Sequence, residues 1–226
     1  MTIATSSPFH TDIDADPGRR ERKRRQKVDH LVVTAFCLFE AKGYETVTME
    51  QIAAEADVAK GTLYNHFPVK EALLAQRFHD ELADGMPQLQ AAMEALPNFS
   101  ARMTYLLRAS ADWSEAHRTY FPYYLHFRLA NADCGQESGK TRHPRSGLDR
   151  LFEALIRTGQ EAGELRTDYP FAQLAHMFQF LYLGAMMRWL ALPDGDLRRE
   201  LDAVLDLFLH GLAVPPSEGK NACTHS

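Results

Sequence analysis

The stretch that decides the fold is residues 48–74, TMEQIAAEADVAKGTLYNHFPVKEALL. Thr48 precedes a helix-spaced apolar set, and Gln51 follows three residues later, which is the pattern of a capping box at the start of a helix. A turn at Asp57 interrupts that helix, and a second short helix is expected to run until Pro68 ends it. The stretch therefore predicts two short helices joined by a tight turn, with a third helix close behind.

The second short helix is expected to present a polar face. Its outward positions are Lys60, Gly61, Thr62, Tyr64, Asn65 and His66. Helix-turn-helix proteins place such a helix in the major groove of DNA, and a helix N-terminus favours phosphate. Gly61 has no side chain, so its backbone could approach DNA closely. For each of these residues the alternative is plain exposure to solvent.

The same stretch resembles the DNA-binding domain of the TetR family of transcription regulators. The residues that carry the resemblance are Thr48, Ile52-Ala53, Ala56-x-Val58, Gly61-Thr62-x-Tyr64, His66-Phe67, Lys70-Glu71 and Leu73-Leu74. Two positions depart from the family pattern. Asp57 stands where glycine is usual, but Asp tolerates a left-handed backbone better than most residues. Ala59 stands where serine is common, which removes a candidate phosphate contact.

The resemblance implies a role for each polar position of the motif. Phosphate contacts are implied for Thr48, Tyr64, His66 and Lys70. Base contacts are implied for Lys60, Thr62 and Asn65, with Gly61 allowing close approach. Lysine can donate to guanine, and asparagine can pair with adenine. His66 has a second interpretation as a packing residue.

A basic segment precedes the motif. The net charge is −5, but residues 19–70 hold 10 basic and 7 acidic side chains, whereas residues 71–226 hold 15 and 20. A basic N-terminal module on an acidic body is typical of nucleic-acid binding at one end of a chain. Residues 19–27 (RRERKRRQK), which end at Lys27, are either a solvated helix start or flexible tail, or an arm that contacts DNA.

The rest of the chain has the apolar spacing of helices, and no strand pattern or internal repeat is evident. Helices are expected from Val28 to Gly43 and at about 70–95, 99–117, 120–131, 145–163, 169–191 and 196–212. Pro87 is expected to kink or break its helix, and residues 131–147 are expected to form a loop.

The predicted fold class is all-α. It combines an N-terminal helix-turn-helix DNA-binding domain with a C-terminal helical domain for ligand binding and dimerisation. The expected divisions are a disordered lead (1–18), the DNA-binding domain with its basic arm (19–73), the effector-binding and dimerisation domain (74–213) and a disordered tail (214–226).

Several function classes lack their signatures. No GxSxG, HExxH or CxxC pattern occurs, so neither an enzyme nor a metal or other cofactor is expected. The N-terminus lacks the apolar core of a signal peptide, and no apolar run is long enough to span a membrane. With three scattered cysteines, a reducing cytoplasm is the expected location. Cys37 is expected to pack in the core, and Cys134 is a candidate thiol sensor.

The resemblance implies an effector pocket in the C-terminal domain. Aromatic side chains with scattered polar groups favour a pocket for a flat or apolar ligand. The candidate ligand-binding residues are Trp113, His117, Tyr120, Tyr124, Phe127, Phe178, Tyr182 and Met186. The alternative is that these side chains form the core or a dimer seam. Multidrug, lipid-like and aromatic effectors are all compatible with this set.

The resemblance also implies a homodimer, with the helices at about 169–191 and 196–212 as its interface. Their apolar stripes are Leu174, Phe178, Leu181 and Ala185 in the first helix, and Leu197, Leu201, Val204, Leu205, Phe208 and Leu212 in the second. The alternative is that one chain buries both stripes internally. A two-fold dimer binds a palindromic site in double-stranded DNA.

The expected function is a repressor that a small hydrophobic or aromatic effector releases from its operator, with the helix near residues 70–86 as the lever. One alternative is a DNA-binding regulator controlled by a protein partner or by thiol chemistry at Cys134. A helical enzyme is the remote alternative.

Overall fold

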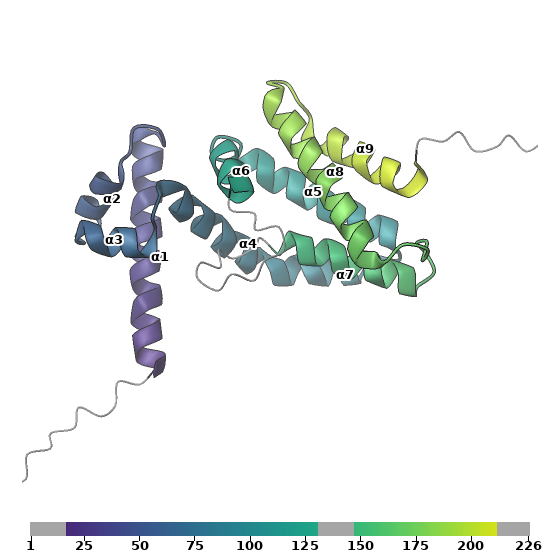
Figure 1. Cartoon of the computed structure of the whole chain (residues 1–226), viewed down its shortest axis with the longest axis horizontal. Helices are drawn as coiled ribbons and strands as arrows, with labels where there is room; N and C mark the ends of the chain where they lie inside the picture. The colour runs from purple at the N-terminus through teal and green to yellow at the C-terminus, as the bar shows by residue number, and fades with distance from the viewer. Residues whose placement is uncertain (1–16, 131–146, 212–226) are drawn as a thin grey trace, which may run out of the picture. The chain divides into compact units, whose positions relative to one another are not determined.

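The computed structural model describes residues 17–130 and 147–211, and all regular secondary structure within them is α-helical (Figure 1). The helices are α1 (Pro17–Lys42), α2 (Met49–Glu55), α3 (Lys60–His66), α4 (Lys70–Glu94), α5 (Phe99–Ala116), α6 (Phe121–Ala130), α7 (Leu148–Glu161), α8 (Phe171–Ala191) and α9 (Leu197–His210). The predicted all-α fold class is confirmed.

The chain divides into two compact units, Met1–Arg77 and Phe78–Ser226, and the boundary expected at residue 73 falls four residues before this division. The disordered lead and tail expected at the two ends, and most of the expected loop, lie outside the described residues.

The short helices of the N-terminal unit are fixed by local hydrogen bonds. Thr48 Oγ1 accepts from the backbone N–H of Gln51 (3.3 Å), and Gln51 Oε1 accepts from the N–H of Thr48 (2.9 Å), so the predicted capping box is present. Asp57, between α2 and α3, has a φ of 52°, the left-handed conformation that Asp tolerates. Gly43 ends α1 with a φ of 83°, as expected.

In this unit α2 packs against both α1 and α3. The fully buried side chains at its centre are Leu31, Ala35, Ile52, Leu63, Leu73 and Leu74. Cys37 was expected in the core but is exposed, because it lies on the side of α1 that faces away from Leu31 and Ala35.

The first helix begins at Pro17, earlier than the apolar pattern from Val28 indicates. Its basic start is therefore helical, and whether these residues are only solvated or contact DNA stays a prediction. Glu21 stabilises these first turns of the helix, because it forms ion pairs with Arg24 at i+3 and Arg25 at i+4.

The C-terminal unit is a layered helical bundle. α8 packs against α7 and α9, and α5 packs against the same two helices. The largest fully buried side chains of this unit are Phe78, Phe152, Phe178, Trp189, Met103 and Leu106. Pro87 does not break α4, which continues to Glu94. A proline inside a helix removes one backbone donor and crowds the carbonyl four residues earlier, so a kink at Pro87 stays a prediction.

Most of the apolar stripes expected at a dimer interface are buried within the chain. The buried members are Leu174, Phe178, Ala185, Leu197, Leu201, Val204 and Leu205. The alternative, internal burial, holds for them because α8 and α9 pack on each other and on α7 and α5. Leu212 lies outside the described residues.

Within residues 17–130 and 147–211, no helix is both long and apolar enough to cross a membrane.

Candidate DNA-binding face and effector cavity

Helix α3 presents the polar positions of the motif at the surface. Leu63 is fully buried and anchors the helix to the core of its unit. The accessible residues are Lys60, Gly61, Thr62, Tyr64 and Asn65, of which Thr62 is half-buried. A Cβ built at Gly61 meets no atom within 4 Å, so another molecule can approach the backbone there. Their DNA contacts remain predictions.

Glu50 in the first turn of α2 joins this face, and its contacts were not expected from the sequence. The Tyr64 hydroxyl donates to Glu50 Oε1 (3.3 Å), and Lys60 Nζ lies 3.9 Å from the same oxygen. Desolvation, together with the charge and the hydrogen bond of Glu50, raises the pKa of Tyr64, so its hydroxyl stays protonated. Because these contacts are exposed, a DNA phosphate can replace the carboxylate at small cost.

Lys70 is held by the segment that precedes α2. Its Nζ donates to the backbone carbonyls of Tyr44 (2.8 Å), Glu45 (3.4 Å) and Val47 (3.4 Å), and it lies 4.4 Å from the centroid of the Tyr44 ring. An ammonium group has three N–H donors, so this arrangement engages all of them. A phosphate contact by Lys70 would have to displace one of these carbonyls.

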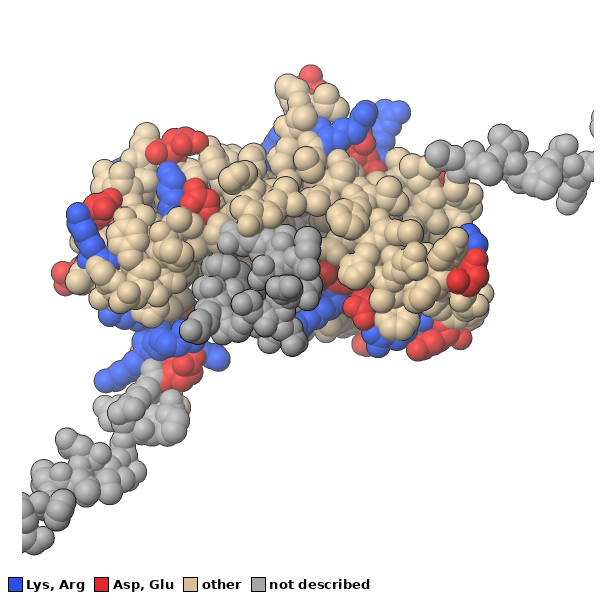
Figure 2. Space-filling model, viewed as in Figure 1, with Lys and Arg blue, Asp and Glu red and all other residues tan. Residues whose placement is uncertain are grey.

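The basic N-terminal turns of α1 add positive charge to the same unit. The exposed cations are Arg22, Lys23, Arg24, Arg25 and Lys27, drawn in blue around the lower end of α1 in Figure 2. The hydrogen bond from Arg24, with its charge and that of Arg25, lowers the pKa of Glu21 to about 2. Thr48 is exposed and His66 is half-buried beside Phe67. With Lys27, they remain predicted phosphate contacts.

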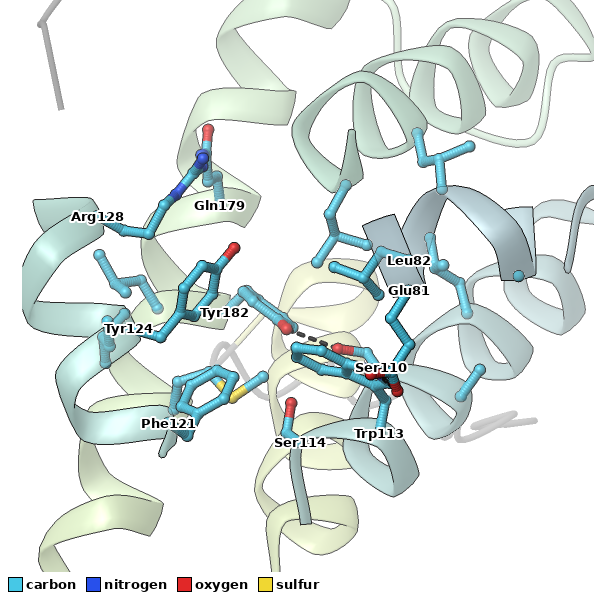
Figure 3. A pocket seen from close by; sticks show the side chains of 18 of the residues that line it. Glu81, Leu82, Ser110, Trp113, Ser114, Phe121, Tyr124, Arg128, Gln179 and Tyr182 are labelled. Carbon is cyan, nitrogen blue, oxygen red and sulfur yellow. Dashed lines mark hydrogen bonds between the residues drawn. The ribbon is translucent and has the colours of Figure 1, made fainter. Parts of the chain in front are cut away.

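The C-terminal unit contains a cavity of about 350 Å³ that is partly open to solvent, a size found for small-ligand sites. Its walls come from the second part of α4 and from α5, α6, α7 and α8 (Figure 3). Most of the lining is apolar and includes Leu82, Met86, Leu106, Phe121, Leu151 and Met186. Burial of apolar ligand surface against such walls is favourable.

Half of the predicted ligand-binding residues line this cavity, namely Trp113, Tyr124, Tyr182 and Met186. The other predicted residues lie beyond its lining. Phe127 and Phe178 are buried in the surrounding core, and Tyr120 precedes α6. His117 packs against Trp113 with ring centroids 4.5 Å apart. Their roles in binding remain predictions.

Polar residues of the wall were missed by the sequence analysis. They are Glu81, Ser110, Ser114, Arg128 and Gln179. The two serines had a usable signal, because they stand four residues apart among the apolar positions of α5. Arg128 and Gln179 carried none, since long polar side chains on a helix are usually exposed.

Two sets of hydrogen bonds organise the polar wall. The hydroxyls of Ser110 and Tyr182 are 2.6 Å apart. Trp113 Nε1 donates to Glu81 Oε1 (3.0 Å), and His117 Nε2 lies 3.2 Å from the same oxygen. These last contacts join α4 to α5 next to the cavity.

Among the side chains of residues 17–130 and 147–211, no group of three or more His, Cys, Asp or Glu could hold a metal ion. Cys134, the candidate thiol sensor, lies outside the described residues.

Comparisons with known proteins cover both units. Residues 31–76 match the model of "Bacterial regulatory proteins, tetR family", and residues 72–211 match "TetR/AcrR family transcriptional repressors, C-terminal domain". The transcriptional repressor KstR of Rhodococcus jostii is 36% identical over 216 residues, which cover 92% of each chain. The regulator TcmR of Streptomyces glaucescens is 42% identical over 67 residues, 30% of each chain.

A solved structure is similar along most of the chain. Thermus thermophilus FadR, a TetR family transcriptional repressor crystallised with lauroyl-CoA, has a TM-score of 0.71 and 25% identity, over 85% of this chain and 98% of that one. These relatives are regulators rather than enzymes. The family models and the KstR match together show that this chain belongs to the TetR family of DNA-binding transcription regulators.

Proposed function

We propose that this protein is a dimeric repressor that binds a palindromic operator through α3 of both protomers and is released by an acyl thioester in its cavity. The observation that carries the proposal is the apolar cavity of about 350 Å³ in the C-terminal unit. Its wall includes part of α4, the helix that begins in the DNA-binding unit.

The effector class is supported by the lining and by a relative. FadR of Thermus thermophilus was crystallised with lauroyl-CoA. In this chain, a mostly hydrocarbon wall is suited to an acyl chain. Arg128 on α6 and Gln179 on α8 both line the cavity (Figure 3), and their N–H groups can donate to a thioester carbonyl or a phosphate.

The dimer is supported by an apolar surface on α8. Its exposed members are Met177, Phe180, Leu181 and Met187, and Phe180 is 73% exposed. Gly184 lies among them, and no atom lies within 4 Å of a Cβ built on it, so a partner helix could approach closely. Contiguous exposed apolar side chains mark interaction sites. A second copy packed on this face would fix the spacing of the two α3 helices.

The signal can travel through α4, which runs without interruption from Lys70 to Glu94. Its first turns belong to the DNA-binding unit, whereas Glu81, Leu82 and Met86 line the cavity. A ligand that moves this wall therefore acts on the same helix that leaves the helix-turn-helix. Coupling between two such sites is typically about 1–3 kcal/mol.

The test combines selection of bound sequences from random duplex DNA with a ligand titration. Wild type is expected to enrich a palindrome that the Tyr64→Ala variant loses. Saturating lauroyl-CoA is expected to weaken operator binding by about 5- to 150-fold. If a palindrome is enriched but no thioester changes its affinity, the effector is wrong and control by a protein partner gains support.

A further inference from the structure

One wall of the cavity carries polar groups that an unsubstituted acyl chain cannot satisfy. Ser114 is only 1% exposed and borders the cavity, yet its Oγ has no hydrogen-bond partner in the described parts of the chain. Ser110 lies one helical turn earlier on α5 and contacts Tyr182. Figure 3 shows both serines on the side of the cavity away from Arg128 and Gln179.

The pair of Ser110 and Tyr182 has one hydroxyl proton to spare. Either hydroxyl can donate across the 2.6 Å separation, and the second proton then needs another acceptor. Burial raises the pKa of Tyr182, against a smaller opposite effect of the Ser110 hydrogen bond, so the phenol keeps its proton. The pair therefore offers an O–H donor toward the cavity.

Glu81 adds an acceptor to this wall. Its Oε1 accepts from Trp113 and faces His117, whereas no hydrogen bond joins Oε2 to the residues that the structure describes. The wall thus combines one spare donor, one unpaired serine hydroxyl and one carboxylate oxygen. Ser114 is the fully buried member of this set, and a site discriminates against an analogue that leaves such a buried group unpaired.

We infer that the effector is an oxygenated acyl thioester, whose acyl group carries a hydroxyl or oxo oxygen that bonds to Ser114 and to the spare O–H of the Ser110–Tyr182 pair. This inference rests on the proposed function, which supplies the thioester class. A ligand hydroxyl accepts from Ser114 and from the one spare O–H of the Ser110–Tyr182 pair, and it donates to Glu81. An oxo oxygen only accepts, so it uses Ser114 and that spare O–H alone.

The test uses the full chain, its selected operator and a positional series of hydroxydodecanoyl-CoA and oxododecanoyl-CoA isomers, with lauroyl-CoA as reference. The readouts are the concentration for half-release of the operator and the thermal shift of the DNA-free protein. At least one oxygenated isomer is expected to be tenfold or more as potent as lauroyl-CoA, roughly the effect of one matched hydrogen bond.

If every oxygenated isomer only equals lauroyl-CoA or is weaker, the inference is overturned while the thioester effector stands. If no thioester binds or releases the operator, both proposals fail.

Variants then test whether Ser110 and Ser114 cause the preference for oxygenated thioesters over lauroyl-CoA. Replacing both serines (Ser110→Ala with Ser114→Ala) is expected to reduce the preference below about threefold while lauroyl-CoA keeps its potency, because the hydrogen bonds to the ligand oxygen are lost and the apolar lining is kept. The Ser110–Tyr182 hydrogen bond is lost as well, which affects the oxygenated and the unsubstituted thioester alike. Ser100→Ala, the same change at an exposed position of α5, should keep the full preference. A full preference in the double variant would overturn the inference.

Tyr182→Phe is a second, independent variant in case the double replacement does not fold. It should also reduce the preference, and an unchanged preference would count against the inference. Glu81→Gln distinguishes a ligand hydroxyl from a ligand oxo group. Only the hydroxyl donates to the Glu81 carboxylate, so hydroxyl isomers should lose potency and oxo isomers should not.

Discussion

The helix-turn-helix unit and the cavity treat their polar side chains in opposite ways. On the DNA-binding face, Glu50 already pairs with Lys60 and Tyr64, and carbonyls engage Lys70 Nζ. In the cavity, Ser114 is buried with no partner among the described residues. If DNA and ligand bind as proposed, DNA would have to replace the existing partners of Lys60, Tyr64 and Lys70, whereas a ligand would supply Ser114 with a partner that the described residues do not.

Among substitutions that test this comparison, the largest change in stability is expected for a replacement of Lys70. Lys70→Met removes the donor to the carbonyls of Tyr44, Glu45 and Val47, and it should lower the free energy of unfolding by roughly 2–3 kcal/mol, the value of hydrogen bonds to a charged group. Denaturant unfolding of the full chain measures it, with the exposed Lys23→Met as the matched control. Unchanged stability with weakened DNA binding would instead make Lys70 a phosphate ligand.

Gly61→Ala separates DNA affinity from stability. A methyl group placed between α3 and the DNA should cost about 1–3 kcal/mol of binding, or about 5- to 150-fold in affinity, as overpacking does. The folded chain should gain up to about 1 kcal/mol, because alanine favours a helix and its Cβ meets no atom within 4 Å. Gly85→Ala makes the same change on α4 at a residue that lines the cavity, so it is the matched control for the ligand-free protein, in which it should leave DNA affinity unchanged. Equal affinities for both variants would show that DNA does not approach Gly61.

Removing one hydroxyl from each region should give stability changes of opposite sign. Thr48→Ala loses the capping box and should destabilise the chain by about 1 kcal/mol. Ser114→Ala removes a buried hydroxyl that has no described partner, so the ligand-free chain should become more stable by up to about 1 kcal/mol. Thermal unfolding of both variants measures this. A loss of stability in both would mean that water or another group satisfies Ser114 in solution.

The smallest effect is expected at Glu50. Glu50→Gln removes a negative charge that competes with phosphate for Lys60 and Tyr64, so operator affinity should rise about two- to threefold at low salt. Salt should shrink the gain, because exposed charges are screened. Fluorescence anisotropy with labelled operator measures both quantities. A fall in affinity would mean that Glu50 positions the two side chains for DNA.

The sequence predicted the N-terminal unit in detail because its signals are local. A capping box spans four residues, and a left-handed turn residue is recognisable by its type, so Thr48, Gln51 and Asp57 were identified correctly. The contacts of Glu50 were missed because they depend on how α2 crosses α3. That angle is set by tertiary packing rather than by any short pattern.

The cavity was only half predictable because its lining comes from several helices. Apolar periodicity identified aromatic positions on α5, α6 and α8, but it could not tell cavity-facing Tyr182 from core-facing Phe178 on the same helix. Arg128 and Gln179 were missed because their position on the wall follows from neighbours distant in sequence. For the same reason, periodicity could not show whether the apolar stripes of α8 and α9 face a partner. They were predicted to form a dimer interface, but most of their side chains are buried within one chain.

The apolar face of α8 has a consequence for the number of protein copies in a cell. If two chains must join through Phe180 and its neighbours before they bind DNA, the amount of active repressor varies with the square of the chain concentration at low levels. A twofold fall in expression would then cost about fourfold in active dimer. Expression of the target gene would then depend on the rates at which this protein is made and degraded, as well as on the effector.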